Sequence, residues 1–191
     1  MPDIQRLCIF CGSNFGRGDI YREATAKLGR VLAENGIEIV YGGTHKGLMG
    51  VVADAALAAG GRVHGVITER LVARGHLHEG LTSHEVVASM RLRKQRMADL
   101  ADAFVALPGG IGTLEEFAEV WTLNQLGDIS KPAGFYDIAG FYGPFLKFVD
   151  HMVEEQFLPA AHRASVVQEA TPEALVKALR AWVPTTTPKW M

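Results

Sequence analysis

The chain has 191 residues, of which 48% are hydrophobic, with 19 basic and 21 acidic residues and a net charge of −2. This composition supports one well-buried α/β core and lacks the strong basic excess of a protein that binds nucleic acid. No apolar run approaches the roughly 18–20 residues of a membrane span, and the N-terminus lacks the apolar core of a signal peptide. We therefore expect a soluble, cytoplasmic protein without nucleic-acid or membrane partners, with one domain over residues 1–183 and a frayed tail over 184–191.

Apolar runs and helical periodicity alternate along the chain. Strands are predicted at 7–10, 37–41, 62–67, 85–87, 103–107, 132–136 and 165–167, and the one at 103–107 is predicted to be buried. Helices are predicted at 20–33, 48–59, 89–100, 113–126, 142–155 and 172–182. Residues 68–82 are predicted to be irregular. Strands that alternate with helices are typical of a Rossmann-like three-layer α/β sandwich, in which helices cover both faces of a central parallel sheet.

The two cysteines, Cys8 and Cys11, have C-x-x-C spacing. Both are expected on the first strand, where positions three apart point to opposite faces. No second C-x-x-C completes a zinc site, so we expect two buried, small apolar residues and no metal. The histidines show no H-E-x-x-H pattern, and His76-x-His78 is interpreted as a solvated loop pair.

Three predicted strands end in glycine turns, which are Gly12-Ser13, Gly42-Gly43 and Gly109-Gly110. In parallel α/β sheets, ligands bind outside the carboxyl ends of the strands, at a switch in strand order. If the three turns lie side by side, they line one crevice. Neither G-x-G-x-x-G nor G-x-x-x-x-G-K-[ST] is present, so a mononucleotide fits these turns better than a dinucleotide or a triphosphate.

The stretch 107–116, Leu-Pro-Gly-Gly-Ile-Gly-Thr-Leu-Glu-Glu, joins a buried strand to a helix. Exposed N–H groups at a helix start favour anions, and glycines let a phosphate approach the backbone closely. Thr113 to Glu116 also matches the capping box, in which the glutamate bonds back to the helix start. Glu116 therefore has two interpretations, a cap or a catalytic carboxylate. An arginine on the preceding helix favours the second.

That arginine is Arg93, which shares one helix face with Met90, Met97 and Leu100. Either it extends out of the apolar stripe to solvent, or it points into the crevice and contacts an anion. The planar, permanently charged guanidinium suits the second role. Lys94 follows about 100° round the helix, and it either reaches the phosphate from the crevice edge or is solvated.

Two signatures carry a family resemblance. Met90-x-x-Arg93-Lys94, followed by Pro108-Gly109-Gly110-x-Gly112-Thr113-x-x-Glu116, resembles the paired motif of the LOG ("lonely guy") family of cytokinin riboside 5′-monophosphate phosphoribohydrolases. Supporting matches are Cys11-Gly12-Ser13, Tyr41-Gly42-Gly43, Gly47-Leu48-Met49-Gly50, Gln125-Leu126-Gly127 and Lys131-Pro132. Members have often been labelled lysine decarboxylases, but nothing in this sequence supports a pyridoxal-phosphate site.

The resemblance implies a nucleotide-binding domain that hydrolyses the N-glycosidic bond of an adenine-type nucleoside 5′-monophosphate to the free base and ribose 5-phosphate, with no cofactor. It also implies a homodimer with sites near the subunit interface. Arg93 and Glu116 map onto the family's catalytic pair. The full set of candidate substrate-binding residues, glycine turns included, is Gly12, Ser13, Gly42, Gly43, Met90, Arg93, Lys94, Gly109, Gly110, Ile111, Gly112, Thr113, Leu114, Glu115, Glu116 and Thr122.

Such cleavage has an oxocarbenium-like transition state, and a nearby carboxylate either stabilises the positive charge or orients the attacking water. Glu116 suits both tasks. Arg93 either assists departure of the base or orients the ribose hydroxyls and the phosphate. The sequence leaves both pairs of roles open.

Two positions depart from the family pattern. Thr44 stands where many members have a third glycine, and Gly75 stands where members commonly carry a glutamate that contacts substrate. The base is therefore open between a cytokinin and plain adenine. The alternative function is a non-catalytic nucleotide-binding or sensor module, or a cofactor carrier, of the same fold. The presence of both Arg93 and Glu116 favours the enzyme, because a carboxylate beside a phosphate would not strengthen nucleotide binding in a protein that only binds.

Overall fold

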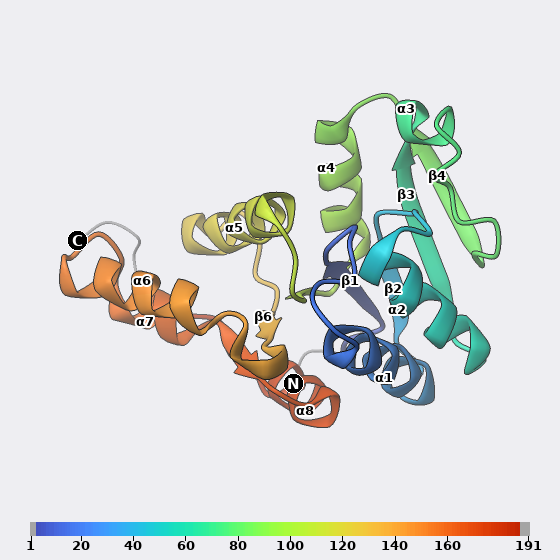
Figure 1. Cartoon of the computed structure of the whole chain (residues 1–191). Coiled ribbons are helices and arrows are strands. Elements are labelled where there is room, and N and C mark those ends of the chain that lie inside the picture. Colours follow the sequence, from blue (N-terminus) through green and yellow to red (C-terminus); the bar gives the residue numbers. More distant parts are fainter. Residues whose placement is uncertain (1–2, 188–191) are drawn as a thin grey trace.

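The computed structural model describes residues 3–187 and has the predicted alternation of strands and helices (Figure 1). The strands are β1 (Arg6–Phe10), β2 (Glu38–Tyr41), β3 (Val63–Thr68), β4 (Ser83–Val87), β5 (Ala103–Ala106), β6 (Ala133–Tyr136) and β7 (Val167–Glu169). The helices are α1 (Ile20–Glu34), α2 (Gly47–Ala58), α3 (Glu69–Val72), α4 (Met90–Leu100), α5 (Ile111–Leu126), the 3₁₀ turn η1 (Ile138–Gly140), α6 (Gly143–Glu154), α7 (Ala160–Ala164) and α8 (Pro172–Arg180).

The seven strands form one parallel sheet in the order β4-β3-β2-β1-β5-β6-β7. The chain adds β2, β3 and β4 on one side of β1 and then crosses to the other side for β5. Cys8 of β1 pairs with Val40 of β2 and with Phe104 of β5. The switch in strand order therefore lies between β1 and β5, where ligands of such sheets bind.

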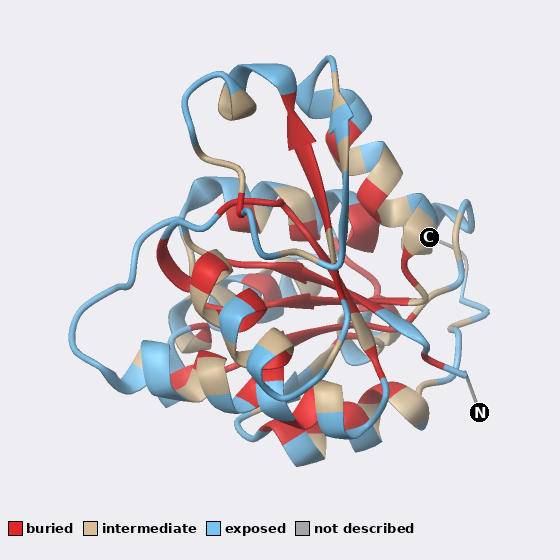
Figure 2. Ribbon diagram, turned by 90° about the vertical axis from the view of Figure 1, so that its right-hand side faces the viewer, coloured by how far each residue is buried: buried red, intermediate tan, exposed pale blue. Residues whose placement is uncertain are grey.

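Helices cover both faces of the sheet, which confirms the predicted Rossmann-like fold. Residues of α1, α2 and α8 pack on one face, and residues of α4, α5 and α6 pack on the other. Figure 2 shows the inner strands as the buried centre and the outer helix faces as exposed, whereas the edge strands β4 and β7 are exposed or half-buried. Cys8 and Cys11 are free and buried in different core clusters, as their spacing predicts.

Two helix ends carry clear capping residues. Ser89 Oγ accepts a hydrogen bond from Leu92 N at 3.2 Å, so Ser89 caps α4. Asn35 is the C-cap of α1, and Gly36 follows with a φ of 69° in the left-handed region that favours glycine.

The structure corrects three smaller predictions. A short helix, α3, lies within the segment predicted to be irregular, and α7 follows Pro159 where no helix was expected. Strand β7 begins at Val167 instead of residue 165, because Ser165 ends α7 and its carbonyl accepts a hydrogen bond from Trp182 Nε1. The single domain over 1–183 stays a prediction, and residues 188–191 of the predicted tail lie outside the described residues. Within residues 3–187, no helix is both long and apolar enough to cross a membrane.

Candidate active site

A cavity of about 300 Å³ opens at the carboxyl ends of the central strands. Its walls come from four places: the turn after β1, the first turn of α2, the first turn of α4 and the start of α5. The lining residues are Cys11, Gly12, Ser13, Met49, Met90, Arg93, Lys94, Gly110, Gly112, Thr113, Glu115 and Glu116. This location agrees with the crevice predicted at the switch in strand order.

The first and third glycine turns lie side by side because neither has room for a side chain. Gly12 N donates to Pro108 O at 3.1 Å, and a Cβ on Gly12 would lie 3.3 Å from Gly109 Cα. A Cβ on Gly109 would lie only 2.1 Å from Thr113 Oγ1. These contacts hold the turn after β1 against the start of α5, which confirms the predicted juxtaposition.

Helix α5 begins at Ile111, two residues earlier than predicted, with Gly110 as its N-cap and no side chain capping it. Thr113 is therefore inside the first turn, where it is buried. The capping-box interpretation of Glu116 is wrong, because glycine at Gly110 already begins the helix. The first N–H groups of α5 have no side-chain acceptor and stand beside the cavity, the arrangement that favours an anion.

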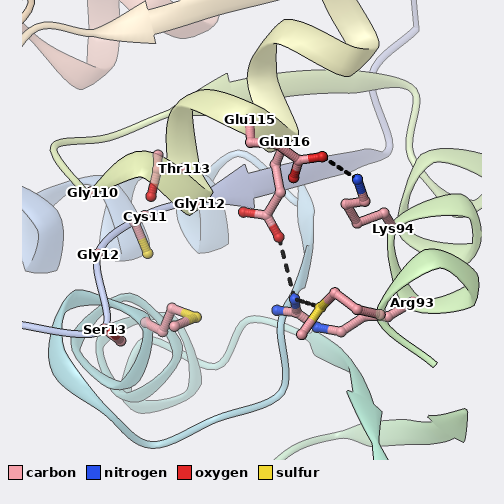
Figure 3. A pocket seen from close by; sticks show the side chains of 12 residues that line it. Cys11, Gly12, Ser13, Arg93, Lys94, Gly110, Gly112, Thr113, Glu115 and Glu116 are labelled. Carbon is pink, nitrogen blue, oxygen red and sulfur yellow. Dashed lines mark hydrogen bonds and ion pairs between the residues drawn. The ribbon is translucent and has the colours of Figure 1, made fainter. Parts of the chain in front are cut away.

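Arg93 is buried, with 7% of its surface exposed, so the interpretation in which it extends to solvent is wrong. Its Nε donates to Val66 O of β3 at 3.0 Å, and its Nη1 donates to Glu116 Oε1 at 3.2 Å. Figure 3 shows the two side chains approaching each other from α4 and α5. The second glycine turn lies behind Arg93, since a Cβ on Gly42 would be 1.8 Å from its Nη2.

The carboxylate of Glu116 is largely buried, with 15% of its side chain exposed. Burial raises the pKa of Glu116 above its usual value, and the neighbouring positive charge of Arg93 opposes that shift. A carboxylate with a raised pKa is a stronger base than a solvated one. Glu116 can therefore accept a proton from water while Arg93 holds it in place.

Lys94 lies at the cavity edge, with 17% of its side chain exposed. Its Nζ pairs with Glu115 and also lies 3.1 Å from Glu119 Oε2. The hydrogen bond to Glu115 raises the pKa of Lys94, so the ammonium stays charged. Of the two interpretations, the structure favours a crevice-edge cation over a solvated one (Figure 3).

Comparisons with known proteins agree with these motifs. A family model described as "Possible lysine decarboxylase" matches residues 49–179. The chain is 44% identical over 180 residues to the cytokinin riboside 5′-monophosphate phosphoribohydrolase LOG of Oryza sativa subsp. japonica, a match that covers 94% of this chain and 74% of the rice protein. It is 42% identical over 180 residues to LOG1 of Arabidopsis thaliana, which carries the same enzyme name, and the match covers 94% of this chain and 84% of LOG1. The chain belongs to the LOG family.

Solved structures similar to this LOG-family protein show the fold alone, because their sequences are distant. The Moco carrier protein of Chlamydomonas reinhardtii superposes with a TM-score of 0.71 at 20% identity and covers 94% of this chain and 99% of the carrier. The molybdenum cofactor binding protein of Rippkaea orientalis has a TM-score of 0.69 at 18% identity, with 95% and 98% covered.

The structure brings ten of the sixteen candidate site residues together around the cavity of this LOG-family chain: Gly12, Ser13, Met90, Arg93, Lys94, Gly110, Gly112, Thr113, Glu115 and Glu116. Gly42 lies behind Arg93, and Gly43 lies against β3. Gly109 lines a neighbouring hollow that shares Gly12, Ser13 and Gly110 with the cavity. These three glycines therefore adjoin the cavity without lining it.

The three remaining candidate residues lie away from the cavity. Ile111 is 82% exposed at the start of α5, and Leu114 packs against the core. Thr122 lines a separate hollow with Trp121 and Phe145, between α5 and α6. Within one chain, therefore, these three side chains do not face the cavity.

Two lining residues, Cys11 and Met49, were not among the candidates. Both belong to motifs that match the family, Cys11-Gly12-Ser13 and Gly47-Leu48-Met49-Gly50. Met49 reaches the cavity because Leu48 N donates to Gly12 O at 3.0 Å, which joins the start of α2 to the turn after β1. The motif matches were the only signal that pointed to them.

The two family departures lie on different loops, Thr44 after β2 and Gly75 after α3, and backbone contacts join these loops. Thr44 is buried and forms an antiparallel bridge with Leu77. Gly75 has a φ of 71°, and no atom lies within 4 Å of a Cβ placed on it. The solvated-pair interpretation is wrong for His78, which is 9% exposed and lies 2.9 Å from Asp54 Oδ1.

Proposed function

We propose that this protein hydrolyses the N-glycosidic bond of an adenine-type nucleoside 5′-monophosphate, releasing the free base and ribose 5-phosphate. The observation that carries this proposal is the buried contact between Arg93 and Glu116, beside the uncapped start of α5. The sequence similarity to enzymes named as phosphoribohydrolases supports it. A binding module would gain little from a buried carboxylate beside a phosphate.

The start of α5 and Lys94 provide the phosphate site in this proposal. The N–H groups of the first turn point toward an anion without side-chain competition. Lys94 adds a mobile positive charge that can leave Glu115 for the phosphate. The ribose then lies near Glu116, one helical turn further along α5.

Glu116 performs the base-removal step together with water. The C1′–N bond breaks with its electron pair leaving on the base, and the oxygen of water forms the new bond to C1′. The proton lost by this water passes to Glu116, and Glu116 then gives a proton to the departing base, which restores the carboxylate. The negative charge of the carboxylate also stabilises the oxocarbenium-like transition state. Arg93 holds Glu116 through Nη1.

The residues do not fit a lysine decarboxylase. That chemistry requires a lysine that forms a Schiff base with pyridoxal phosphate, and such a lysine is activated by a lowered pKa. Lys94 is the one lysine that lines the described cavity, and its pairing with Glu115 and Glu119 raises its pKa. We derive no step through pyridoxal phosphate.

Two finer points belong to the proposal. The substrate is AMP or an N6-modified AMP, because Gly75 has no side chain at the position where members of the family commonly carry a glutamate that contacts substrate. The assembly is a homodimer that covers exposed apolar residues on α4 and α5, among them Leu92 and Ile111.

The direct test is incubation of the purified protein with AMP and with isopentenyladenosine 5′-monophosphate, followed by chromatography of the base and assay of ribose 5-phosphate. Equal amounts of base and ribose 5-phosphate are expected, and the relative rates identify the preferred base. Adenosine, which lacks the phosphate, is the matched control and should react far more slowly. Binding of both nucleotides without release of any base would refute the enzyme and favour the binding module.

A further inference from the structure

The loop after α3 crosses the glycine turn after β2, and the contact between them has a definite geometry. His78 N donates to Gly43 O at 3.0 Å, and His45 N donates to His76 O at 3.3 Å. Thr44 and Leu77 form an isolated antiparallel bridge between these two bonds. Residues 76–80, which we call the strap, therefore lie along residues 43–45 as a short two-stranded contact.

The side chain of His78 fixes the strap at one end. Gly80 N donates to His78 Nδ1 at 3.1 Å, so this nitrogen is the acceptor and the ring proton is on Nε2. Nε2 then donates to Asp54 Oδ1 of α2 at 2.9 Å. Only 10% of the His78 side chain is exposed, whereas 73% of Asp54 is. The His78 ring thus makes one hydrogen bond within the strap, to Gly80 N, and one hydrogen bond to Asp54 that joins the strap to α2.

The turn that the strap covers is the one behind Arg93. Gly43 has a φ of 73°, and a Cβ on it would lie 3.0 Å from Ile67 Cβ, so the turn has little room to shift toward β3. Its neighbour Gly42 contacts the guanidinium of Arg93, whose Nε is bonded to Val66 O. Movement of this turn would change the space in which the guanidinium lies.

We propose that His78 is a positioning residue for Arg93, acting through the strap and the Gly42–Gly43 turn. The path runs from Asp54 through His78 and Gly43 to Gly42 and ends at the guanidinium that holds Glu116. The catalytic consequence rests on the proposed hydrolase function. The structural claim, that His78 restricts the motion of Arg93, does not.

Two isosteric variants separate the two bonds of His78. His78→Gln places its amide nitrogen near the position of Nε2 and keeps the bond to Asp54, while it loses the acceptor for Gly80. His78→Asn keeps an acceptor for Gly80 and loses the bond to Asp54. Asp54→Ala removes the same hydrogen bond between His78 and Asp54, but the substituted residue is on α2 and the strap itself is unchanged. His84→Ala, at an exposed histidine on β4, is the matched control.

The experiment measures hydrogen exchange of the Arg93 Nε–H signal by nuclear magnetic resonance, with Arg93→Lys identifying the signal, together with kcat and KM for AMP. His78→Ala, His78→Asn and Asp54→Ala are expected to accelerate this exchange roughly tenfold or more. They should also lower kcat on the order of tenfold, with KM changed less than about twofold, because small displacements of a reacting group are costly. His78→Gln and His84→Ala should resemble the parent.

The outcomes separate the two claims. Parent-like Arg93 exchange in the folded His78→Ala and Asp54→Ala variants would overturn the positioning role. Faster exchange spread evenly over all amides would also overturn it, because it would show only a loss of global stability. A parent that releases no base would refute the proposed hydrolase, while the exchange measurement would still decide the role of His78.

Discussion

The direction of the Arg93 side chain is determined by residues of neighbouring segments rather than by the sequence of its own helix. Its apolar stripe left two directions open, toward solvent or toward the crevice. The structure shows the second, because Val66 O and Glu116 accept its hydrogen bonds and Gly42 leaves space for its guanidinium. A buried arginine needs such partners, since an unpaired buried charge is strongly destabilising. Those partners come from distant segments, so no local pattern could have identified them.

The contact between Gly42 and Arg93 gives a sharp prediction. In Gly42→Ala, the new methyl group would lie 1.8 Å from Arg93 Nη2, and the nearest atoms are the ends of flexible side chains. The protein should therefore fold, with Arg93 displaced from Glu116. We expect base release to fall by about 100-fold, the scale of a misplaced catalytic group. Gly143→Ala, at a glycine with no atom within 4 Å of its Cβ, is the control for stability and rate. Parent-like rates in Gly42→Ala would contradict the role of this glycine.

The electrostatics of Glu116 predict the pH dependence of the reaction. Burial raises its pKa, so the carboxyl stays protonated to a higher pH than the roughly 4.3 of a free glutamate. The reaction needs the carboxylate, and kcat/KM should therefore fall as the pH drops through this raised pKa. Lys94→Met should move the acid limb further upward, because the charge of Lys94 lowers the pKa of Glu116. A pH profile of kcat/KM tests both statements, and an acid limb at or below about 4.3 would refute them.

At the scale of elements, the start of α5 shows both the strength and the limit of sequence patterns. The strand, glycine turn and helix at 103–126 were predicted correctly in type and order. The capping-box match misplaced the helix start, because the glycine N-cap and the contact of Thr113 with Gly109 decided it. His78 was likewise misjudged as a solvated residue, since its partner Asp54 lies 24 residues away on α2.

If the phosphate binds between α4 and α5 as proposed, a substitution there should change KM for the nucleotide without changing kcat. Lys94→Met removes the mobile cation and leaves the pair of Arg93 and Glu116 in place. Since hydrogen bonds to charged groups contribute about 1.5–3 kcal/mol, KM for AMP should rise roughly tenfold or more while kcat changes little. Steady-state kinetics measure this split, with Lys147→Met on the exposed face of α6 as the matched control. A fall in kcat with unchanged KM would place Lys94 in the chemical step instead.

At the scale of the whole molecule, the alternation of strands and helices predicted the parallel sheet and its two helical layers. The strand order could not be predicted from the sequence, because no local pattern indicates that β5 pairs with β1 on the edge opposite to β2. That crossing brings the turns after β1 and β5 together and places α4 opposite α5. The cavity is therefore a product of topology, although its residue types could be recognised from motifs.

The proposed dimer is also a whole-molecule claim. Leu92 on α4 is 52% exposed and Ile111 on α5 is 82% exposed, and large apolar side chains at such positions favour association. Sedimentation velocity should show the parent as a dimer, and Leu92→Glu should weaken the dimer at least roughly tenfold by burying an unpaired charge. Ile20→Glu, at a residue 50% exposed on α1 at the opposite face of the sheet, should not. A monomeric parent would refute the dimer.

The central claim is that Glu116 performs the base-removal step, and Glu116→Gln tests it most directly. Glutamine keeps the volume of the side chain and an oxygen that can accept the hydrogen bond from Arg93 Nη1. The measurement is release of adenine from AMP by chromatography, with calorimetric binding of AMP to both proteins in parallel. We predict that the parent releases adenine, and that the folded variant binds AMP but releases adenine about 10²–10⁴-fold more slowly, the usual contribution of general acid–base catalysis. Release of adenine by Glu116→Gln at the parent rate would contradict the account.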